Sequence, residues 1–197
     1  GKEKLGTLIS VRKEGSMNAQ GADVGIVNTA LDGVGYRVDF AVMGTQNYQI
    51  TTAAKGSVFM PIFGQSSPQD MPDDAFKASQ IYLDLKGFFI NYKEKGTKVE
   101  FTAKETIDGV ECYKLIATFK NGNTTNFFID TKTDRLYKTT TKGSANGEAV
   151  DVFTTYSNYK QNADGYWFAY TTTNERGDIN YDKIETNIKV DQSIFKD

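Results

Sequence analysis

Alternation of apolar and polar positions runs along most of this chain and predicts β-strands. In the first third it covers four runs, followed by a less regular one: 7–17, 23–30, 35–43, 47–53 and 56–60. After residue 97 the same alternation continues to the end of the chain. Asx-Gly pairs recur between the runs and favour type I′ hairpin turns, which need positive φ at both central residues: Asp32-Gly33, Asp108-Gly109, Asn121-Gly122, Asn146-Gly147 and Asp164-Gly165.

Residues 64–96 lack this alternation and predict a helix. A capping acid, an early proline and two further acids at the positive end of the helix dipole are typical of a helix start: Asp70, Pro72, Asp73 and Asp74. Apolar residues then recur at alternating spacings of four and three, which place them on one stripe of a helix over 70–89. The stripe comprises Met71, Ala75, Ala78, Tyr82, Leu85 and Phe89, and Phe76, Ile81 and Phe88 widen it.

The order of these elements predicts a mainly β (α+β) fold. Strands come first, a helical insert follows at about 68–94, and strands fill the remainder, so one antiparallel sheet dominates the architecture. No linker, low-complexity segment or exact repeat interrupts the pattern. We therefore expect a single domain over residues 1–197.

Composition excludes several classes of function. The 197 residues include no His and a single Cys, and their net charge is −2. Without His there is no Ser-His-Asp or Cys-His catalysis and no His-ligated zinc, and one Cys cannot build a thiolate cage. The basic residues are dispersed, which argues against a nucleic-acid partner. We expect no catalytic residue, no metal, no cofactor and hence no enzyme.

Two clusters of acidic residues were considered as candidate sites. Asp178, Asn180 and Asp182 have the first spacings of a calcium-binding loop, but Lys occupies the positions that need Gly and Glu. A polar hairpin loop is the favoured interpretation. Asp130 and Asp134 bracket another turn beside basic residues, which favours a solvated turn over acid–base chemistry.

The stretch ECYKLIATFKNGNTTNFFIDTKTDRLYKTTTKG, residues 111–143, holds the lone cysteine. Cys112 has no candidate base beside it, so a structural role is favoured over a functional thiol. Phe127 and Phe128 follow each other in the next run and point to opposite faces. Both faces of that strand are therefore covered, or one of them faces a cavity.

Two further stretches are rich in apolar and aromatic residues. VFMPIFG, residues 58–64, lies directly before the helical insert, and DGYWFAY, residues 164–170, contains the single Trp. Each stretch suits either buried core or the wall of an apolar pocket covered by the helix. The pattern alone leaves both interpretations open.

Several of these stretches, in this order, resemble the outer-membrane lipoprotein-sorting carriers (LolA-like) of Gram-negative envelopes. They are GKEKLGTLISVRKEGS, MPIFGQSSPQDM, INYKEKGTKVEF, DGVECYKLIATFKNGNTTNFFIDTKTDRLYKT, YSNYKQNADGYWFAY and IETNIKVDQSIFKD. The resemblance covers nearly the whole chain. It implies a large curved antiparallel sheet, an unclosed β-barrel, with a helical plug on its concave face and acyl chains held between sheet and helix.

The chain also departs from the pattern of these carriers. An Asp-Gly-Lys-x-x-Trp stretch is common before the P-FG segment, and AAKGSVFMPIFG lacks its Asp and Trp. The carriers use a strand Arg to latch the lid, and Arg37 in YRVDF matches it only roughly in position. Many proteins share such a fold without being carriers, so the fold transfers more safely than the function.

Residues and resemblance together predict a periplasmic carrier that binds the acyl chains of a lipid or lipoprotein. Partners would be these acyl chains and an envelope lipoprotein donor or acceptor. The signal peptide would have been removed, because the chain begins with Gly1, and attachment to the outer membrane stays open. The alternative is a non-catalytic envelope interaction module with a closed core. The expected apolar lining comprises Phe59, Met60, Phe63, Phe76, Ile81, Leu85, Phe89 and Phe168.

Overall fold

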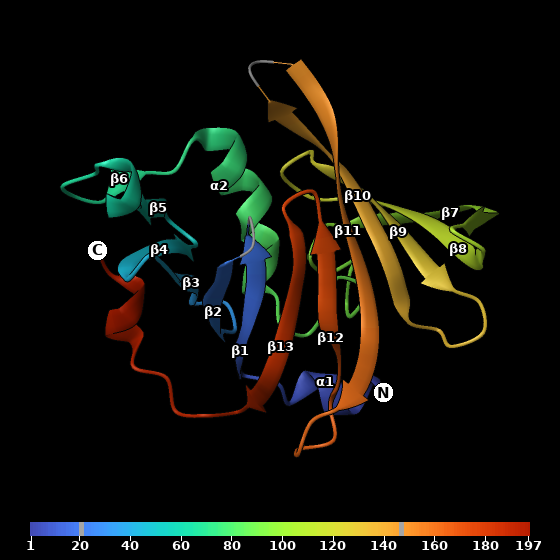
Figure 1. Ribbon diagram of the computed structural model, residues 1–197. Coiled ribbons are helices and arrows are strands. Elements are labelled where there is room, and N and C mark those ends of the chain that lie inside the picture. Colours follow the sequence, from blue (N-terminus) through green and yellow to red (C-terminus); the bar gives the residue numbers. More distant parts are fainter. Residues whose placement is uncertain (20–21, 146–147) are drawn as a thin grey trace. The chain divides into compact units, whose positions relative to one another are not determined.

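The computed structural model describes residues 1–19, 22–145 and 148–197 (Figure 1). The chain forms two compact units. Unit 1 comprises Gly1–Phe88, Lys160–Phe168 and Ile179–Asp197, and unit 2 comprises Phe89–Tyr159 and Ala169–Asp178. The expectation of a single domain stays a prediction.

Antiparallel strands make up most of both units, as predicted. The described residues contain thirteen strands in one sheet, with the order β6-β5-β4-β3-β2-β1-β13-β12-β11-β10-β9-β8-β7. Because β6 and β7 end this order without pairing to each other, the sheet is not closed into a barrel. The strands are β1 Ser10–Ala19, β2 Ala22–Leu31, β3 Gly35–Val42, β4 Thr45–Thr52, β5 Gly56–Phe59, β6 Gln69–Asp70, β7 Lys98–Ile107, β8 Val110–Thr118, β9 Thr124–Asp130, β10 Leu136–Ala145, β11 Glu148–Gln161, β12 Trp167–Asn174 and β13 Gly177–Thr186.

Short helical elements accompany the strands. The chain begins with a helix, α1 (Lys2–Gly6), so the first strand starts three residues later than the predicted run. The insert contains α2 (Asp73–Ser79) followed by the 3₁₀ helix η2 (Gln80–Leu83), and the described residues outside the insert contain the 3₁₀ helices η1 (Pro61–Phe63) and η3 (Gln192–Phe195).

The expectation of type I′ turns at the Asx-Gly pairs was largely wrong. Only Asp108 and Gly109 both have positive φ, 50° and 84°. At three other pairs the glycine alone has positive φ: Asp32-Gly33, Asn121-Gly122 and Asp164-Gly165. At one of these, the Asn121 side chain accepts a hydrogen bond from the Asn123 N–H, which stabilises a different turn. The pair Asn146-Gly147 lies outside the described residues.

A two-residue turn occurs where the sequence carries no Asx-Gly signal. Met43 and Gly44 have φ of 50° and 77° and join β3 to β4, with Val42 paired to Thr45. The Met43 side chain is 93% exposed. The close pairing of the two strands therefore holds a methionine in a conformation that usually selects Asn or Gly.

The predicted helix over 70–89 is much shorter in the structure. Helix α2 begins after Pro72 with no side-chain cap, tightens into η2 and ends at Leu83. Beyond it, backbone groups bond to the turn between β2 and β3: the Gly33 N–H donates to the Leu83 carbonyl and the Leu85 N–H to Asp32 Oδ1. These tertiary hydrogen bonds satisfy groups that a longer helix would have paired internally.

Each unit has its own buried residues. The buried apolar residues of unit 1 are Leu8, Val11, Val24, Ile26, Ala30, Ile50, Tyr166, Tyr181, Ile184 and Phe195, and those of unit 2 are Cys112, Ala117, Phe127, Phe128 and Ala169. The adjacent Phe127 and Phe128 are 1% and 5% exposed. Both side chains of β9 are thus buried, which agrees with the first of the two alternatives that its apolar pattern left open.

Candidate functional site

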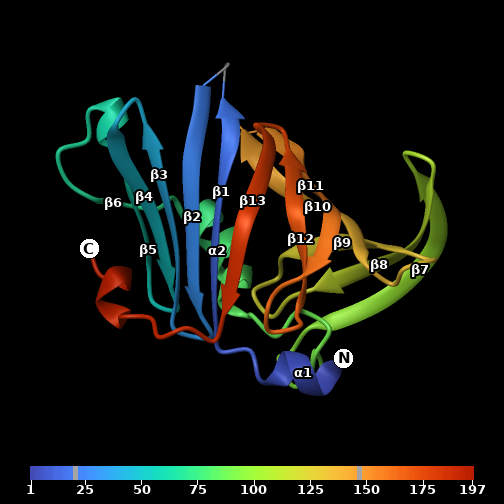
Figure 2. The ribbon, with the colours of Figure 1, turned by 60° about the horizontal axis from the view of Figure 1, so that its bottom comes forward.

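One face of the unit 1 strands carries the helical insert. Thr51 Oγ1 of β4 donates to Ser79 Oγ of α2 at 2.9 Å, and the rings of Tyr36 and Tyr82 stack with centroids 4.8 Å apart. Figure 2 shows α2 behind β1 and the neighbouring strands β2 and β13. Strand pairing places the following residues together on this helix-side face: Val11, Lys13, Ile26, Asn28, Ala30, Tyr36, Val38, Phe40, Asn47, Gln49, Thr51, Gly56, Val58, Ile184 and Thr186.

A glycine in β5 lets the insert approach the sheet closely. A Cβ on Gly56 would lie 2.9 Å from Phe76 Cδ2 and 3.1 Å from Met71 Sδ. The Met71 N–H donates to the Gly56 carbonyl at 2.8 Å, which extends the pairing beyond β6. Gly56 therefore fixes where α2 begins and how near Phe76 comes to the sheet.

The apolar stripe of the insert is only partly covered. No residue of α2 or η2 is buried. Phe76, Ile81 and Leu85 are each partly exposed, and Tyr82 is 48% exposed despite its ring contact. The insert thus rests on the sheet through a few specific contacts and leaves much of its apolar surface available to another group.

The predicted lining residue Phe59 lies on the other face of the sheet. Its ring packs against Tyr48, with centroids 5.4 Å apart, and the two residues are paired between β5 and β4. The Arg37 guanidinium stacks over the same Tyr48 ring at 4.3 Å. This face is the one that η3 covers, so the structure does not bring Phe59 together with Phe76.

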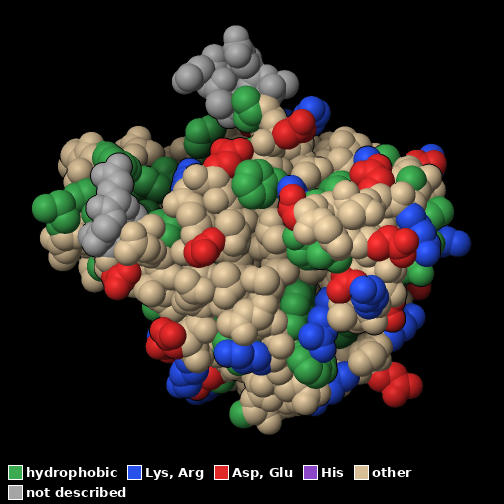
Figure 3. All heavy atoms as spheres, turned by 45° about the vertical axis from the view of Figure 1, so that its right-hand side comes forward, with side chains coloured by type: hydrophobic (Ala, Val, Ile, Leu, Met, Phe, Trp, Pro, Cys, Tyr) green, Lys and Arg blue, Asp and Glu red, His purple; other side chains and the backbone are tan. Residues whose placement is uncertain are grey.

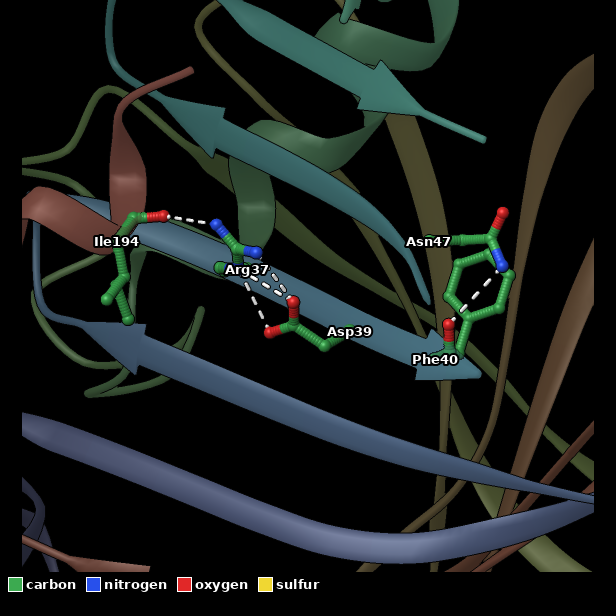
Figure 4. Close-up of polar contacts among 5 residues, drawn as sticks. All are labelled: Arg37, Asp39, Phe40, Asn47 and Ile194. Carbon is green, nitrogen blue, oxygen red and sulfur yellow. Dashed lines mark hydrogen bonds and ion pairs between the residues drawn. The ribbon is translucent and has the colours of Figure 1, made fainter. Parts of the chain in front are cut away.

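Arg37 holds the C-terminal segment to the sheet. Its guanidinium donates to the Asp39 carboxylate, with a closest distance of 2.7 Å, and to the Ile194 carbonyl of η3 at 2.8 Å (Figure 4). Arg37, which matches the carriers' latching Arg only roughly in position, does not contact the helical insert through these bonds. Arg37 bonds to η3, on the face opposite α2.

Met60 precedes η1 and Phe63 ends it, and η1 lies near the start of β4. The Met60 N–H donates to Gln65 Oε1 at 2.7 Å, and the Ile62 N–H donates to Asn47 Oδ1 at 3.4 Å. The Asn47 amide also donates weakly to the Phe40 carbonyl at 3.5 Å (Figure 4). These bonds fix η1 while the Phe63 side chain remains 79% exposed.

The last two predicted residues belong to different units. Phe168 lies in unit 1, partly exposed, with its ring 6.4 Å from that of Tyr166. Phe89 lies in unit 2, where its ring packs edge-on against Phe127 at 5.0 Å. Phe168 thus lies in the part of β12 that belongs to unit 1, and Phe89 packs against Phe127 within unit 2.

Sequence analysis missed Lys13, which lies on the helix-side face. Its ammonium lies 5.4 Å from the Phe168 ring centroid and 5.2 Å from that of Tyr181. Burial lowers the pKa of Lys13 from 10.5 to about 8. The sequence did carry a signal for this position. Side chains two residues apart on a strand share a face, so in the charged run Arg12-Lys13-Glu14 the charge of Lys13 shares a face with Val11.

Two other candidate groups, Cys112 and Asp130, have local structural surroundings. Burial, and next the Asp130 carboxylate, raise the pKa of the Cys112 thiol, which is fully buried. Asp130 instead closes a turn by accepting from the Lys132 N–H and the Thr133 hydroxyl, and these bonds lower its pKa. Within the described residues no group of His, Cys, Asp and Glu could hold a metal ion.

The acidic stretch 178–182 lies in a strand rather than in the expected hairpin loop. It belongs to β13, which begins at Gly177, and the turn before that strand comprises Glu175 and Arg176. On the face that Figure 3 shows, acidic and basic side chains are interspersed and neither forms a large patch.

Comparisons with known proteins assign the fold. No family model and no curated protein matches the chain. A putative outer membrane lipoprotein-sorting protein domain from Vibrio parahaemolyticus is similar in structure, with a TM-score of 0.59 and 16% identity over 95% of this chain and 89% of that one. A LolA superfamily protein from Nitrosomonas europaea has a TM-score of 0.60 and 14% identity over 96% and 90%.

A DUF1329 family protein from Desulfovibrio piger is similar as well, with a TM-score of 0.56 and 13% identity over 99% of this chain and 92% of that one. The chain therefore has a LolA-like fold, as the sequence resemblance predicted. At these identities the likeness establishes the fold alone. Among the described residues, no helix has the length and apolar character needed to cross a membrane.

Proposed function

We propose that this chain is a non-enzymatic carrier of the bacterial periplasm that binds the acyl chains of a lipid or lipoprotein on the helix-side face of unit 1. The observation that carries this proposal is the partly covered apolar stripe of α2 and η2, in which no residue is buried. A closed structural module would be expected to bury that stripe. The LolA-like fold supports the same proposal by analogy.

The proposed contacts are Phe76, Ile81, Leu85 and Phe168. Each is partly exposed, so an acyl chain could remove further apolar area from water without displacing a core residue. Burial of each methylene contributes about 0.8 kcal/mol, which allows a long chain to bind firmly without polar contacts along its length. The proposed function therefore needs no catalytic residue.

The other predicted lining residues differ from these four in the role proposed for them. Met60 and Phe63 are proposed as outer contacts, with Phe63 exposed enough to meet a donor or acceptor lipoprotein. Phe89 remains a separate prediction for unit 2. Phe59 is not among the proposed contacts, because it faces η3.

Uptake of an uncharged probe tests this proposal. The probe is the methyl ester of a fluorescent long-chain fatty acid. Phe76→Asp is expected to abolish saturable binding because it places a charge on the apolar stripe. Lys77→Asp is the matched control, because Lys77 is exposed on the same helix, and it is expected to bind the ester like the unchanged protein. Circular dichroism checks that both variants are folded.

Two results would contradict the proposal. If the unchanged protein takes up no ester, and organic extraction of protein purified from an envelope fraction yields no lipid by mass spectrometry, the chain is an interaction module. If Phe76→Asp binds the ester as well as Lys77→Asp does, the stripe is not the binding surface.

A further inference from the structure

The helix-side face carries one cation in apolar and aromatic surroundings. Lys13 of β1 pairs with Asn28 of β2 on one side and with Ile184 of β13 on the other. Directly opposed residues have Cβ atoms about 5 Å apart, so these three side chains adjoin one another. The rings of Phe168 and Tyr181 lie over the ammonium at 5.4 Å and 5.2 Å. Figure 2 shows β1 between β2 and β13.

A bulge brings the Tyr181 ring to this position. The pairing of β1 with β13 shifts between Glu14 and Gly15, so that Gly15 opposes Tyr181. A Cβ on Gly15 would lie 2.0 Å from the Asn180 carbonyl oxygen and 2.7 Å from Tyr181 Cα. Glycine is therefore required where the backbones approach, and the bulge aims the Tyr181 ring toward Lys13.

The Lys13 ammonium has no anion beside it among the described residues. The neighbouring charged side chains bond to one another on the opposite face: Arg12 contacts Glu14 and Glu185, and Lys183 contacts Glu185 at 2.9 Å. The helix-side residues of β2, Val24, Ile26, Asn28 and Ala30, carry no charge. On β13 the titratable group that faces Lys13 is Tyr181. A partly buried charge without a partner is unfavourable, and an anion brought by a ligand would relieve it.

A polar acceptor adjoins the cation. Asn28 Nδ2 donates to Tyr181 Oη at 2.9 Å. Asn28 Oδ1 is buried and has no hydrogen-bond partner among the described residues. A buried acceptor of this kind carries an energetic cost unless some group donates to it. Lys13 and Asn28 together thus leave both a positive charge and an acceptor unsatisfied at one place.

We propose that Lys13, with Asn28 beside it, forms a headgroup subsite that binds the anionic group, a carboxylate or a phosphate, of an amphiphile. This inference rests on the proposed function. Neighbouring strands lie about 4.8 Å apart, so Lys13 on β1 is roughly 14 Å from β4, where α2 is attached. A long acyl chain can span that distance from Lys13 toward Phe76. The subsite makes the carrier selective for anionic over neutral amphiphiles.

The test compares two probes that differ in charge alone. They are a fluorescent long-chain fatty acid and its methyl ester, measured at pH 7 with the full chain. Lys13→Met is expected to weaken binding of the acid at least about tenfold, because the ammonium is the counterion, and to change binding of the ester less than about twofold. Lys183→Met is the matched control. It removes the same charge from the opposite face and is expected to leave both affinities unchanged.

Competition distinguishes the two anions. Lysophosphatidic acid that displaces the fluorescent acid better than unlabelled fatty acid does would assign the subsite to a phosphate. The reverse order would assign it to a carboxylate. Displacement by inorganic phosphate alone, without an acyl chain, would contradict an amphiphile as the ligand.

A second measurement uses the unchanged protein. Nuclear magnetic resonance of labelled lysine side chains is expected to show the pKa of Lys13 rising when the fatty acid is added and staying constant when the ester is added. A purely structural lysine would not respond in this way.

Each failure has a separate meaning. If the unchanged protein binds the ester and the acid equally well, or if Lys13→Met weakens both to the same extent, the headgroup subsite is wrong and the proposed carrier function stands. If the unchanged protein binds neither probe, the proposed function fails and the subsite fails with it.

Discussion

Replacing Lys13 by Met should stabilise the protein at neutral pH. The ammonium lies against Phe168 and Tyr181 with no anion beside it among the described residues, and burial lowers its pKa from 10.5 to about 8. A lowered lysine pKa means that the folded state holds the charge less favourably than the unfolded chain does. Met has a similar length, carries no charge and suits apolar surroundings.

The size of the effect follows from the two pKa values. Each pKa unit corresponds to about 1.36 kcal/mol, so the fall from 10.5 to about 8 corresponds to roughly 3 kcal/mol. This free-energy cost to the folded state is fully present below pH 8, where Lys13 is protonated in both the folded and the unfolded protein. It decreases as the pH rises from about 8 toward 10.5, because in that interval the unfolded chain binds more protons than the folded one. Partial exposure of the side chain makes 3 kcal/mol an upper value.

Urea unfolding of three proteins at pH 7 and at pH 10.5 provides the assay. Lys13→Met should be more stable than the unchanged protein at pH 7, by up to about 3 kcal/mol, and the difference should shrink at pH 10.5. Lys183→Met accounts for the loss of one positive charge elsewhere. The reasoning is refuted if the unchanged protein and Lys13→Met show the same pH dependence. It is also refuted if Lys13→Met is the less stable of the two at pH 7, since Lys13 would then have a satisfied structural role.

Two further substitutions test other contacts. Arg37→Met should lower the free energy of unfolding in urea by about 1–3 kcal/mol, because it removes the bond to the Ile194 carbonyl. Ester binding should stay unchanged, because Arg37 lies on the face opposite α2. Weakened ester binding would show that the two faces are coupled. Gly15→Ala should destabilise the protein by more than about 2 kcal/mol in thermal unfolding, because the new Cβ would lie 2.0 Å from the Asn180 carbonyl oxygen. Gly25→Ala should be nearly neutral in the same measurement, because nothing lies within 4 Å of a Cβ at Gly25. Equal losses in the two glycine variants would argue against the bulge.

The strand pattern was predictable because alternation is a local property of the chain. The runs in the first third correspond to β1–β5, and the adjacent Phe127 and Phe128 limited β9 to two alternatives, of which the structure shows both side chains buried. The antiparallel pairing of consecutive strands followed from short connections, whereas the pairing of β1 with β13 brings together strands far apart in the chain. The resemblance to LolA-like carriers added the unclosed sheet, which the strand order of the structure confirms.

Helix length and turn type were less predictable. The apolar spacing continued to Phe89, but η2 ends at Leu83, where backbone groups bond to the turn after β2. Likewise, only one of the described Asx-Gly pairs has positive φ at both residues. In both cases hydrogen bonds to distant or neighbouring groups outweighed a local preference.

The candidate site depended most on the tertiary structure. Phe59 and Phe76 were predicted to line the same apolar pocket, yet the pairing of β5 with β4 places Phe59 on the face away from α2. In the sequence alone, Lys13 looks like a solvated charge in a charged run. In the structure, the bulge brings Tyr181 close to Lys13, and the pairing of β1 with β2 places Asn28 beside it. Alternation along a strand determines which side chains share a face. Which face meets the helix, and which distant residues meet there, is decided by register and by contacts between segments far apart in the chain.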